Sequence, residues 1–348
     1  MASSNYINTT SCHIIMAMSN LIRICVESTI QHFKAHRTVL LIIFLPLTLL
    51  ITLSPSSPIV IAQGEGTENI QVWGSVGSNP GQFNNPAGIV LDPKGYVFVV
   101  DSNNDRIQKF TSNGTFVDEW GTAGAGPGQF NRPIGITMDY TNGHVYVTDT
   151  GNDRIQKFTS NGTFVDEWGT AGAGPGQFNT VIGIDEDDDK QNVYVTDVGN
   201  NRVERFTNDG LFVSEWGTAG AGPGQFNNPG RIALDPSGNL FVADFGNNRI
   251  QKFDENGNLI TMWGTGGAGP GQFYNPTGMT VQFPQGNVFV ADSGNSRIQQ
   301  FDNSGKFVKE YSIGENTGDI TNIDLDVDSD GKIYLTDRGL DVIKVISP

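Results

Sequence analysis

Apolar and polar positions alternate in short runs along most of this chain. Between residues 134 and 168 the alternation marks four such runs: Ile134–Asp139, His144–Asp149, Arg154–Phe158 and Thr163–Trp168. Sequences rich in Gly, Asn and Asp separate the runs. Alternation with a period of two, interrupted by turn-forming residues, is typical of antiparallel β-strands. This stretch therefore predicts four short strands joined by tight turns.

The same four-strand pattern occurs six times between about residue 70 and residue 346. Aromatic marker residues recur at intervals of 47 or 48 residues: Trp73, Trp120, Trp168, Trp216, Trp263 and Tyr311. A four-stranded repeat of this length is typical of a β-propeller blade. We therefore predict an all-β, six-bladed propeller of four-stranded blades.

The two ends of the repeat region predict how the ring closes. The last copy stops after its third strand, Val342–Ile346, and the region begins with a lone equivalent of a fourth strand, Asn69–Trp73. An incomplete last blade would leave an unpaired sheet edge. We therefore predict that the N-terminal strand completes blade 6.

A glycine-rich link joins consecutive copies, except after the fifth, and contains a Pro-Gly pair. A phenylalanine follows each pair two residues later. We predict that these phenylalanines fill the gaps between neighbouring blades: Phe83, Phe130, Phe178, Phe226 and Phe273.

The third strand of five copies is introduced by the motif Asp-x-x-Asn-x-Arg, followed by a hydrophobic residue. Its Asp and Arg positions are Asp101 and Arg106, Asp149 and Arg154, Asp197 and Arg202, Asp244 and Arg249, and Asp292 and Arg297. With Pro-x-Gly-Ile before the first strand, this motif closely resembles that of the NHL-repeat proteins. The resemblance covers residues 70 to 346 and implies a six-bladed propeller. The sixth copy departs from it, because no arginine stands at the usual place.

The resemblance also bears on function. Proteins of this family mostly bind partners, and some carry a ubiquitin-ligase RING domain or bind RNA through a basic face. The repeats here are acidic and contain no cysteine, so neither of those activities is carried over. We interpret the recurring Asp and Arg as a structural turn motif, because a short turn needs acceptors for its free N–H groups.

Charge narrows the range of partners further. The chain has 21 basic and 37 acidic residues, of which residues 63–348 hold 18 and 36. An acidic surface repels phosphate groups, so we expect no nucleic-acid partner. It also disfavours docking on anionic lipid, and we expect membrane contact only through the N-terminal hydrophobic segment.

That hydrophobic segment is Val39–Leu53. Lys34 and Arg37 precede it, and no basic residue follows before Lys94. This asymmetry predicts an extracytoplasmic propeller. Fifteen residues are few for a membrane span and small residues lie near Ala62, which favours a cleaved signal peptide; the alternative is a retained anchor. We therefore divide the chain into a leader, residues 1–62, and a propeller, residues 63–348, that is secreted or anchored by residues 39–62.

The sequence offers little for catalysis. His144 is the only histidine after residue 36, and both cysteines, Cys12 and Cys25, precede the hydrophobic segment. The amidating lyases with a related propeller hold zinc with several histidines, which this chain lacks. His144 also occupies a strand-entry position, where other copies have Tyr96, Asn192, Asn239, Asn287 or Lys332. We therefore predict no catalytic residues.

Four residues depart from the repeat in the innermost strands: Asp185, Arg231, Asp324 and Asp326. Aligned with the other copies, they stand in two columns that otherwise hold Gly, Ala, Val or Thr. The period-two alternation turns all four toward the central channel. Three carboxylates and one arginine there could hold a cation, such as calcium, or a polar ligand; the alternative is a solvated channel that tolerates charge.

The sixth copy also contains an acidic run, Asp326, Asp328 and Asp330, that matches the first half of a calcium-binding loop. Asp337 has the spacing of the last ligand but should lie too far up the next strand. We expect a weak calcium turn or a solvated acidic turn.

Asn113 and Asn161 stand in Asn-Gly-Thr sequences on two hairpins. These are glycosylation sequons, and Asn-Gly is also a common turn former.

Three functions remain open. The leading one is an exported, non-catalytic binding or scaffold propeller that presents its loop faces to a protein or glycan. The second is a calcium-dependent lactonase or esterase that uses the channel carboxylates, and the third is a structural role in the cell envelope. Calcium is the one candidate cofactor.

Overall fold

The computed structural model describes residues 59–60, 69–313 and 323–347. Among these residues, no helix is long and apolar enough to cross a membrane. The predicted leader, residues 1–62, lies outside the described residues except for strand β1 (Ile59–Val60).

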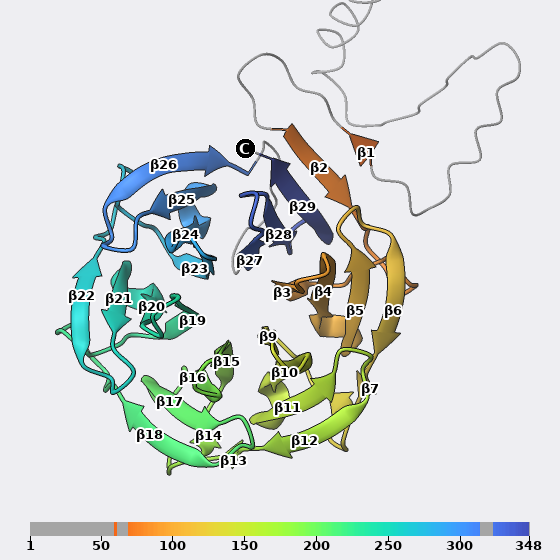
Figure 1. The fold of residues 1–348 in the computed structure, drawn as a ribbon, viewed down its shortest axis with the longest axis horizontal. Helices are drawn as coiled ribbons and strands as arrows, with labels where there is room; N and C mark the ends of the chain where they lie inside the picture. The colour runs from red at the N-terminus through yellow and green to blue at the C-terminus, as the bar shows by residue number, and fades with distance from the viewer. Residues whose placement is uncertain (1–58, 61–68, 314–322, 348) are drawn as a thin grey trace, which may run out of the picture. The chain divides into compact units, whose positions relative to one another are not determined.

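Six β-sheets stand around a central axis, each with its first strand innermost, so that the described repeats form a six-bladed propeller (Figure 1). Blade 1 consists of β3 (Pro86–Leu91), β4 (Tyr96–Asp101), β5 (Arg106–Thr111) and β6 (Phe116–Trp120). Blade 2 consists of β9 (Ile136–Asp139), β10 (His144–Asp149), β11 (Arg154–Thr159) and β12 (Phe164–Trp168). Blade 3 consists of β15 (Val181–Asp187), β16 (Asn192–Asp197), β17 (Arg202–Thr207) and β18 (Phe212–Trp216). Blades 4 and 5 consist of β19 (Pro229–Leu234), β20 (Leu240–Asp244), β21 (Arg249–Phe253) and β22 (Leu259–Trp263); and β23 (Pro276–Gln282), β24 (Asn287–Asp292), β25 (Arg297–Phe301) and β26 (Phe307–Ser312).

Blade 6 is assembled from both ends of the repeat region. Its inner strands are β27 (Leu325–Val327), β28 (Ile333–Asp337) and β29 (Val342–Ser347), and its fourth strand is β2 (Asn69–Trp73). Strand β2 runs antiparallel to β29, with Asn69 opposite Ser347 and Trp73 opposite Ile343. Figure 1 shows the orange β2 beside the dark-blue β29. The predicted closure of the ring is therefore confirmed, and β1 adds a fifth strand outside β2.

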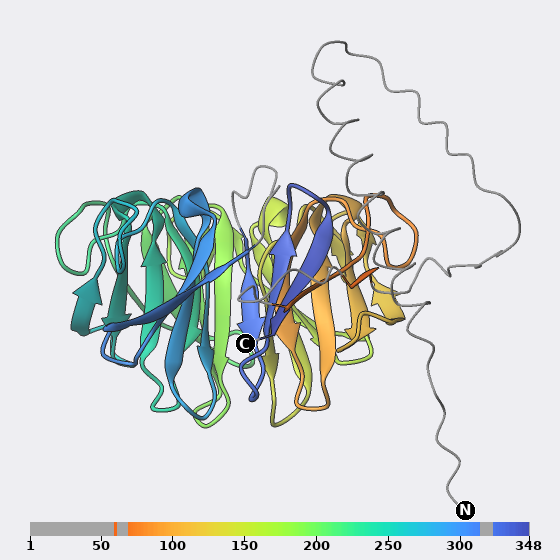
Figure 2. The same cartoon turned by 90° about the horizontal axis from the view of Figure 1, so that it is seen from above.

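The links between blades contain two short parallel strand pairs, β7 (Thr122–Ala123) with β8 (Gln129–Phe130), and β13 (Thr170–Ala171) with β14 (Gln177–Phe178). In four blades a 3₁₀ turn connects the second and third strands: η2 (Ser102–Asn104), η3 (Thr150–Asn152), η4 (Phe245–Asn247) and η5 (Ser293–Asn295). Strands run between two faces of the ring, and the hairpin turns lie on those faces (Figure 2).

The first strand of blade 2 begins at Ile136, two residues later than predicted. The backbone N–H of Gly135 donates to Oγ1 of Thr148 at 2.6 Å, while the N–H of Ile134 donates to the Thr148 carbonyl. The threonine side chain thus enters the ladder where a regular strand pair would continue. Blades 1, 3, 4 and 5 show a register shift at the matching place.

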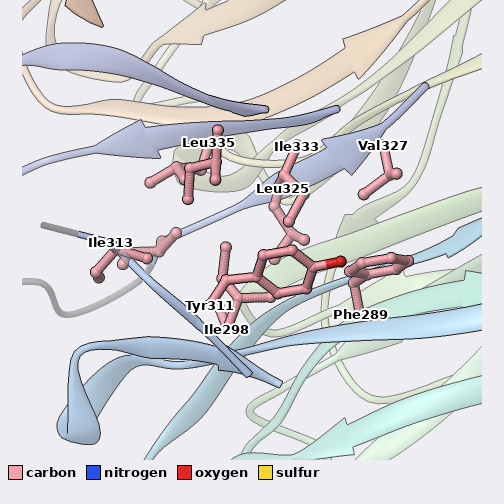
Figure 3. Packing of buried hydrophobic residues seen from close by; sticks show 11 residues of the cluster. Phe289, Ile298, Tyr311, Ile313, Leu325, Val327, Ile333 and Leu335 are labelled. Atoms are coloured by element: carbon pink, nitrogen blue, oxygen red, sulfur yellow. The ribbon is translucent and has the colours of Figure 1, made fainter. Parts of the chain in front are cut away.

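The hydrophobic core lies between neighbouring blades rather than under one continuous sheet. Phe130 is fully buried and packs with residues of both blade 1 and blade 2. Its ring centroid lies 5.6 Å from that of Phe158, and Trp120 of the preceding blade lies 6.2 Å from Phe158. Figure 3 shows the corresponding cluster between blades 5 and 6, in which Tyr311 packs with Leu325 and neighbouring aliphatic residues.

Candidate functional site

The Asp and Arg of the repeated motif tie each blade to the link that precedes it. Asp101 lies at the end of β4 and accepts hydrogen bonds from the Asn84 N–H at 2.8 Å and from Nε of Arg106 at 2.8 Å. Arg106 also donates to the carbonyls of Asn79 and Gln82 in the link. The same Asp–Arg pair closes at 2.7–2.9 Å in the other four copies: Asp149–Arg154, Asp197–Arg202, Asp244–Arg249 and Asp292–Arg297.

These aspartates are buried, and burial raises the pKa of Asp101 although hydrogen bonds from Asn84, Asn104 and Arg106 oppose the shift. Blade 6 has no motif arginine, and Lys344 of β29 replaces it. Its Nζ lies 2.8 Å from Asp337 and donates to the Ile313 carbonyl at 2.9 Å. The motif carboxylates are therefore occupied by structural contacts.

A cavity of about 820 Å³ follows the central axis and is lined by residues of all six blades. Its lining includes eleven acidic residues and three basic ones, and all four predicted channel residues are among them. The channel is therefore strongly anionic. Whether its carboxylates can bind a ligand depends on the contacts they already make.

Asp185 and Asp326 make matching contacts in opposite blades. Asp185 accepts hydrogen bonds from Thr137 Oγ1 of blade 2 at 2.9 Å and from the Leu234 N–H of blade 4 at 2.7 Å. Asp326 accepts them from Thr280 Oγ1 of blade 5 at 2.9 Å and from the Leu91 N–H of blade 1 at 2.8 Å. Each carboxylate thus links its two neighbouring blades.

Burial raises the pKa of Asp185 to about 7 and that of Asp326 to about 6, against the opposing effect of these hydrogen bonds. Both oxygens of each carboxylate already accept a hydrogen bond. Each carboxylate oxygen has a second acceptor site, so a metal ion would share these oxygens with the contacts between blades. Blades 3 and 6 lie on opposite sides of the ring (Figure 1).

Arg231 and Asp324 meet across the channel. Nη2 of Arg231 lies 3.3 Å from Oδ2 of Asp324 and donates to the Ile134 carbonyl at 3.1 Å. Asp324 also accepts a hydrogen bond from the Ile89 N–H at 3.3 Å. Burial lowers the pKa of Arg231 and raises that of Asp324, while their mutual attraction opposes both shifts. The pair neutralises two of the four predicted channel charges.

The acidic run of blade 6 is divided among separate contacts. Oδ1 of Asp328 accepts the N–H groups of Asp330 and Lys332 at 3.0 and 2.9 Å, which closes the turn between β27 and β28. Asp326 contacts the neighbouring blades, and Asp330 is exposed. Asp337 lies at the far end of β28, against Lys344.

The two sequon asparagines, Asn113 and Asn161, are exposed on the turns between the third and fourth strands of blades 1 and 2. Oδ1 of Asn113 accepts hydrogen bonds from both Oγ1 and N–H of Thr115. His144 begins β10, and its Nδ1 lies 3.7 Å from Asp139.

Glu186 is a candidate residue that none of the sequence patterns above identifies. It follows Asp185 in β15 and stands in a column that the other blades fill with buried apolar residues: Leu91, Met138, Leu234, Val281 and Val327. A single carboxylate in an apolar column is the sequence signal that could have identified it. Asp139, Glu186 and Asp188 form the one carboxylate group with metal-ligand spacing among the described residues.

The fold and the repeated Asp–Arg turn motif define a six-bladed β-propeller whose blades are copies of one sequence repeat. Residues 83–110, 130–158, 226–253 and 273–301 match the NHL repeat. The chain is therefore an NHL-repeat protein. No curated protein matches its sequence significantly.

Solved structures share the fold at low sequence identity. Virginiamycin B lyase from Staphylococcus aureus is 17% identical, with 81% of this chain and 99% of that chain covered and a TM-score of 0.56. A gluconolactonase from Xanthomonas campestris is 13% identical, with 84% and 94% covered and a TM-score of 0.59. A chain of the nidogen/laminin complex is 18% identical, with 65% and 80% covered and a TM-score of 0.50. At these identities the likeness concerns the fold alone, which serves both enzymes and binding proteins.

Proposed function

We propose that this chain is an exported, non-catalytic binding propeller whose acidic channel mouth receives a basic segment of a partner protein. The observation that carries the proposal is the state of the channel carboxylates. Asp185 and Asp326 hold neighbouring blades together, and Asp324 is paired with Arg231. Carboxylates that already make such contacts stabilise the fold and are poorly placed to take part in catalysis.

The mouth of the channel supports a protein partner. On the face that carries the turns between first and second strands, Asp189 and Asp330 are exposed beside two exposed aromatic side chains. Tyr140 and Phe283 both line the mouth, with exposed fractions of 45% and 51%. Aromatic rings and carboxylates together attract lysine and arginine side chains, through cation–π contacts and charge complementarity. A neutral glycan would leave the charge unmatched.

A labelled oligo-lysine/arginine peptide tests this surface by fluorescence anisotropy. We expect saturable binding that weakens with salt, because exposed charges are screened. The variant Phe283→Ala/Asp330→Asn should bind at least about threefold more weakly, as expected when an aromatic contact and a charge are removed.

The matched control is Val117→Ala/Asp118→Asn, which removes an exposed apolar side chain and an exposed acid from the outer strand β6. It should bind like the parent. Equal loss in both variants would show that net charge alone attracts the peptide and would contradict a defined mouth.

A calcium-dependent lactonase or esterase is the second candidate, favoured by the shared fold with a gluconolactonase and by carboxylates in the channel. A hydrolysis screen over lactones and aryl esters, with calcium and with chelator, tests it. We expect no calcium-dependent turnover. Turnover that disappears in Asp185→Asn and Asp326→Asn would replace the binding function with hydrolysis.

Export is supported by the charge asymmetry around Val39–Leu53. Protease added to intact cells should remove the propeller epitope. Protection until lysis would contradict export. A purely structural role in the cell envelope would predict no peptide binding at the mouth.

A further inference from the structure

Three carboxylates gather where blades 2 and 3 meet. Asp139 ends β9 of blade 2, Glu186 lies in β15 of blade 3, and Asp188 follows in the next turn. One carboxylate oxygen from each residue lies within 4.8 Å of the other two. The group therefore spans the seam between the two blades.

Glu186 is the member of this group that lacks compensation. Its residue is 7% exposed, both carboxylate oxygens are shielded from solvent, and they accept no hydrogen bond from any described donor. In the other blades this position packs into the apolar clusters between blades. A buried carboxylate is costly unless a positive charge, a metal ion or a proton compensates it.

His144 is the one positively ionisable side chain in the described part of the chain that lies within ion-pair distance of the group, with its Nδ1 3.7 Å from Asp139. Among the described residues, no lysine or arginine forms an ion pair with Asp139, Glu186 or Asp188. Asn142 donates to both oxygens of Asp139, and the Thr141 N–H donates to Asp188 at 3.1 Å, so these two carboxylates are held in place. Each of their oxygens keeps an acceptor site that a cation could use.

We propose that Asp139, Glu186 and Asp188 bind a divalent cation, calcium in the first place, that joins blades 2 and 3. Calcium takes oxygen ligands at about 2.3–2.6 Å, so two ligands of one ion lie at most about 5 Å apart. The observed spacing meets that limit. Three carboxylates and no thiolate suit a hard cation.

The proposed ligands do not include Asp185 or Asp326, although Glu186 and Asp188 also line the central cavity. Glu186 and Asp185 are consecutive residues of β15, and consecutive side chains of a strand point to opposite faces. Asp185 binds blades 2 and 4 through hydrogen bonds, whereas Glu186 faces the seam with blade 2. The proposed cation site therefore uses a different side chain of β15 from the one that links blades 2, 3 and 4.

Calcium titration of the chelator-treated full chain tests the proposal, by calorimetry and by thermal unfolding. We expect a single site and an increase in Tm of about 5 °C near a hundredfold excess over Kd. Glu186→Gln keeps the side-chain shape, removes the charge and should weaken calcium binding at least tenfold.

The control is Asp189→Asn, because Asp189 is an exposed acid in the same turn and lies outside the group. It should bind calcium within about twofold of the parent, since an exposed charge contributes little. Loss of binding in this control equal to that in Glu186→Gln would overturn the assigned ligands and indicate general attraction to the acidic face.

A second variant keeps the test decisive if Glu186→Gln folds poorly. Glu186→Leu restores the residue type of the apolar column, so it should melt above the parent in chelator and show no calcium response. A parent that shows neither heat nor a Tm change up to about 10 mM calcium, beyond the range of weak protein sites, would overturn the proposal. In that case a proton shared among the three carboxyls compensates Glu186. Peptide binding at the mouth should survive in Glu186→Leu, which separates this test from that of the proposed function.

Discussion

Blades 3 and 6 face each other across the channel and carry an aspartate at the same position of the innermost strand, Asp185 and Asp326. In both blades the carboxylate accepts a threonine hydroxyl from the preceding blade and a backbone N–H from the following blade. The next residue differs, since blade 3 has Glu186 and blade 6 has Val327. Val327 packs into the cluster between blades 5 and 6, whereas Glu186 has no described hydrogen-bond partner.

This difference separates two kinds of departure from a repeat. The aspartates occur twice with the same partners, and their contacts explain them as links between blades. Glu186 occurs once, in an apolar column, and the described protein groups do not compensate it. A residue that departs from the repeat and finds no hydrogen-bond partner in the protein is the better indication of a ligand.

Removal of β2 should have the largest effect, because blade 6 depends on a strand from the far end of the chain and blade 3 does not. Deleting Asn69–Trp73 removes the pairing with β29 and Trp73 from the core between blades 6 and 1. We expect Tm to fall by more than about 10 °C, or the cooperative transition to disappear. A deletion that melts within about 2 °C of the parent would contradict the closure seen here.

Placing a glutamate in blade 6 tests whether the surroundings of Glu186 are special. The residues of blades 5 and 6 that match Asp139 and Asp188 are Gln282 and Ser329, so Val327→Glu gains no carboxylate partners. We expect a loss of about 3 kcal/mol in unfolding free energy, without rescue by calcium, because an unpaired charge is buried. Denaturant unfolding with and without calcium measures it. If calcium restored the unfolding free energy of this variant, any buried glutamate at this strand position would respond to calcium. The surroundings of Glu186 would then not be special.

The shared role of the two channel aspartates predicts matched losses. Asp185→Ala and Asp326→Ala each leave a backbone N–H and a threonine hydroxyl without their acceptor. We expect each to lower the unfolding free energy by about 2 kcal/mol. Effects that differ by more than about 1.5 kcal/mol would show that the two blades use this position differently.

The smallest effect concerns pH. Burial raises the pKa of Asp326 from 3.8 to about 6, so the folded protein binds this proton more tightly than the unfolded chain does. The stability from this group is present below pH 4 and is lost as pH rises toward 6 and above. The gap in Tm between the parent and Asp326→Asn, with the parent higher, should therefore be wider at pH 4 than at pH 7. A gap that widens with pH would contradict the assigned direction.

Much of the fold could be predicted from the sequence because each blade repeats the same local rules. Strands β2, β10 and β29 begin where the alternation of residues begins, and the motif Asp101 to Arg106 gave the family. The start of β9 was placed two residues too early, because its pairing with β10 is broken beside Gly135. This irregularity recurs at the matching place in blades 1, 3, 4 and 5, and no alternation pattern contains it.

The site was less predictable, because its contacts join residues about one repeat apart. Alternation predicted that Asp185 and Asp326 face the channel, and both line the central cavity. The hydrogen bonds that occupy them come from donors in two other blades, which no alternation pattern contains. Glu186 becomes a candidate ligand because Asp139, which stands 47 positions earlier in the sequence, lies close to it at the seam between blades 2 and 3. Only the closed ring creates that proximity.

The most direct measurement is the anomalous scattering of crystals of the protein grown with calcium. We expect one peak at the seam, between Asp139, Glu186 and Asp188, with channel hydrogen bonds to Asp185 and Asp326 unchanged. A peak in the channel at Asp185 or Asp326, with none beside Glu186, would contradict this expectation and would favour channel chemistry instead.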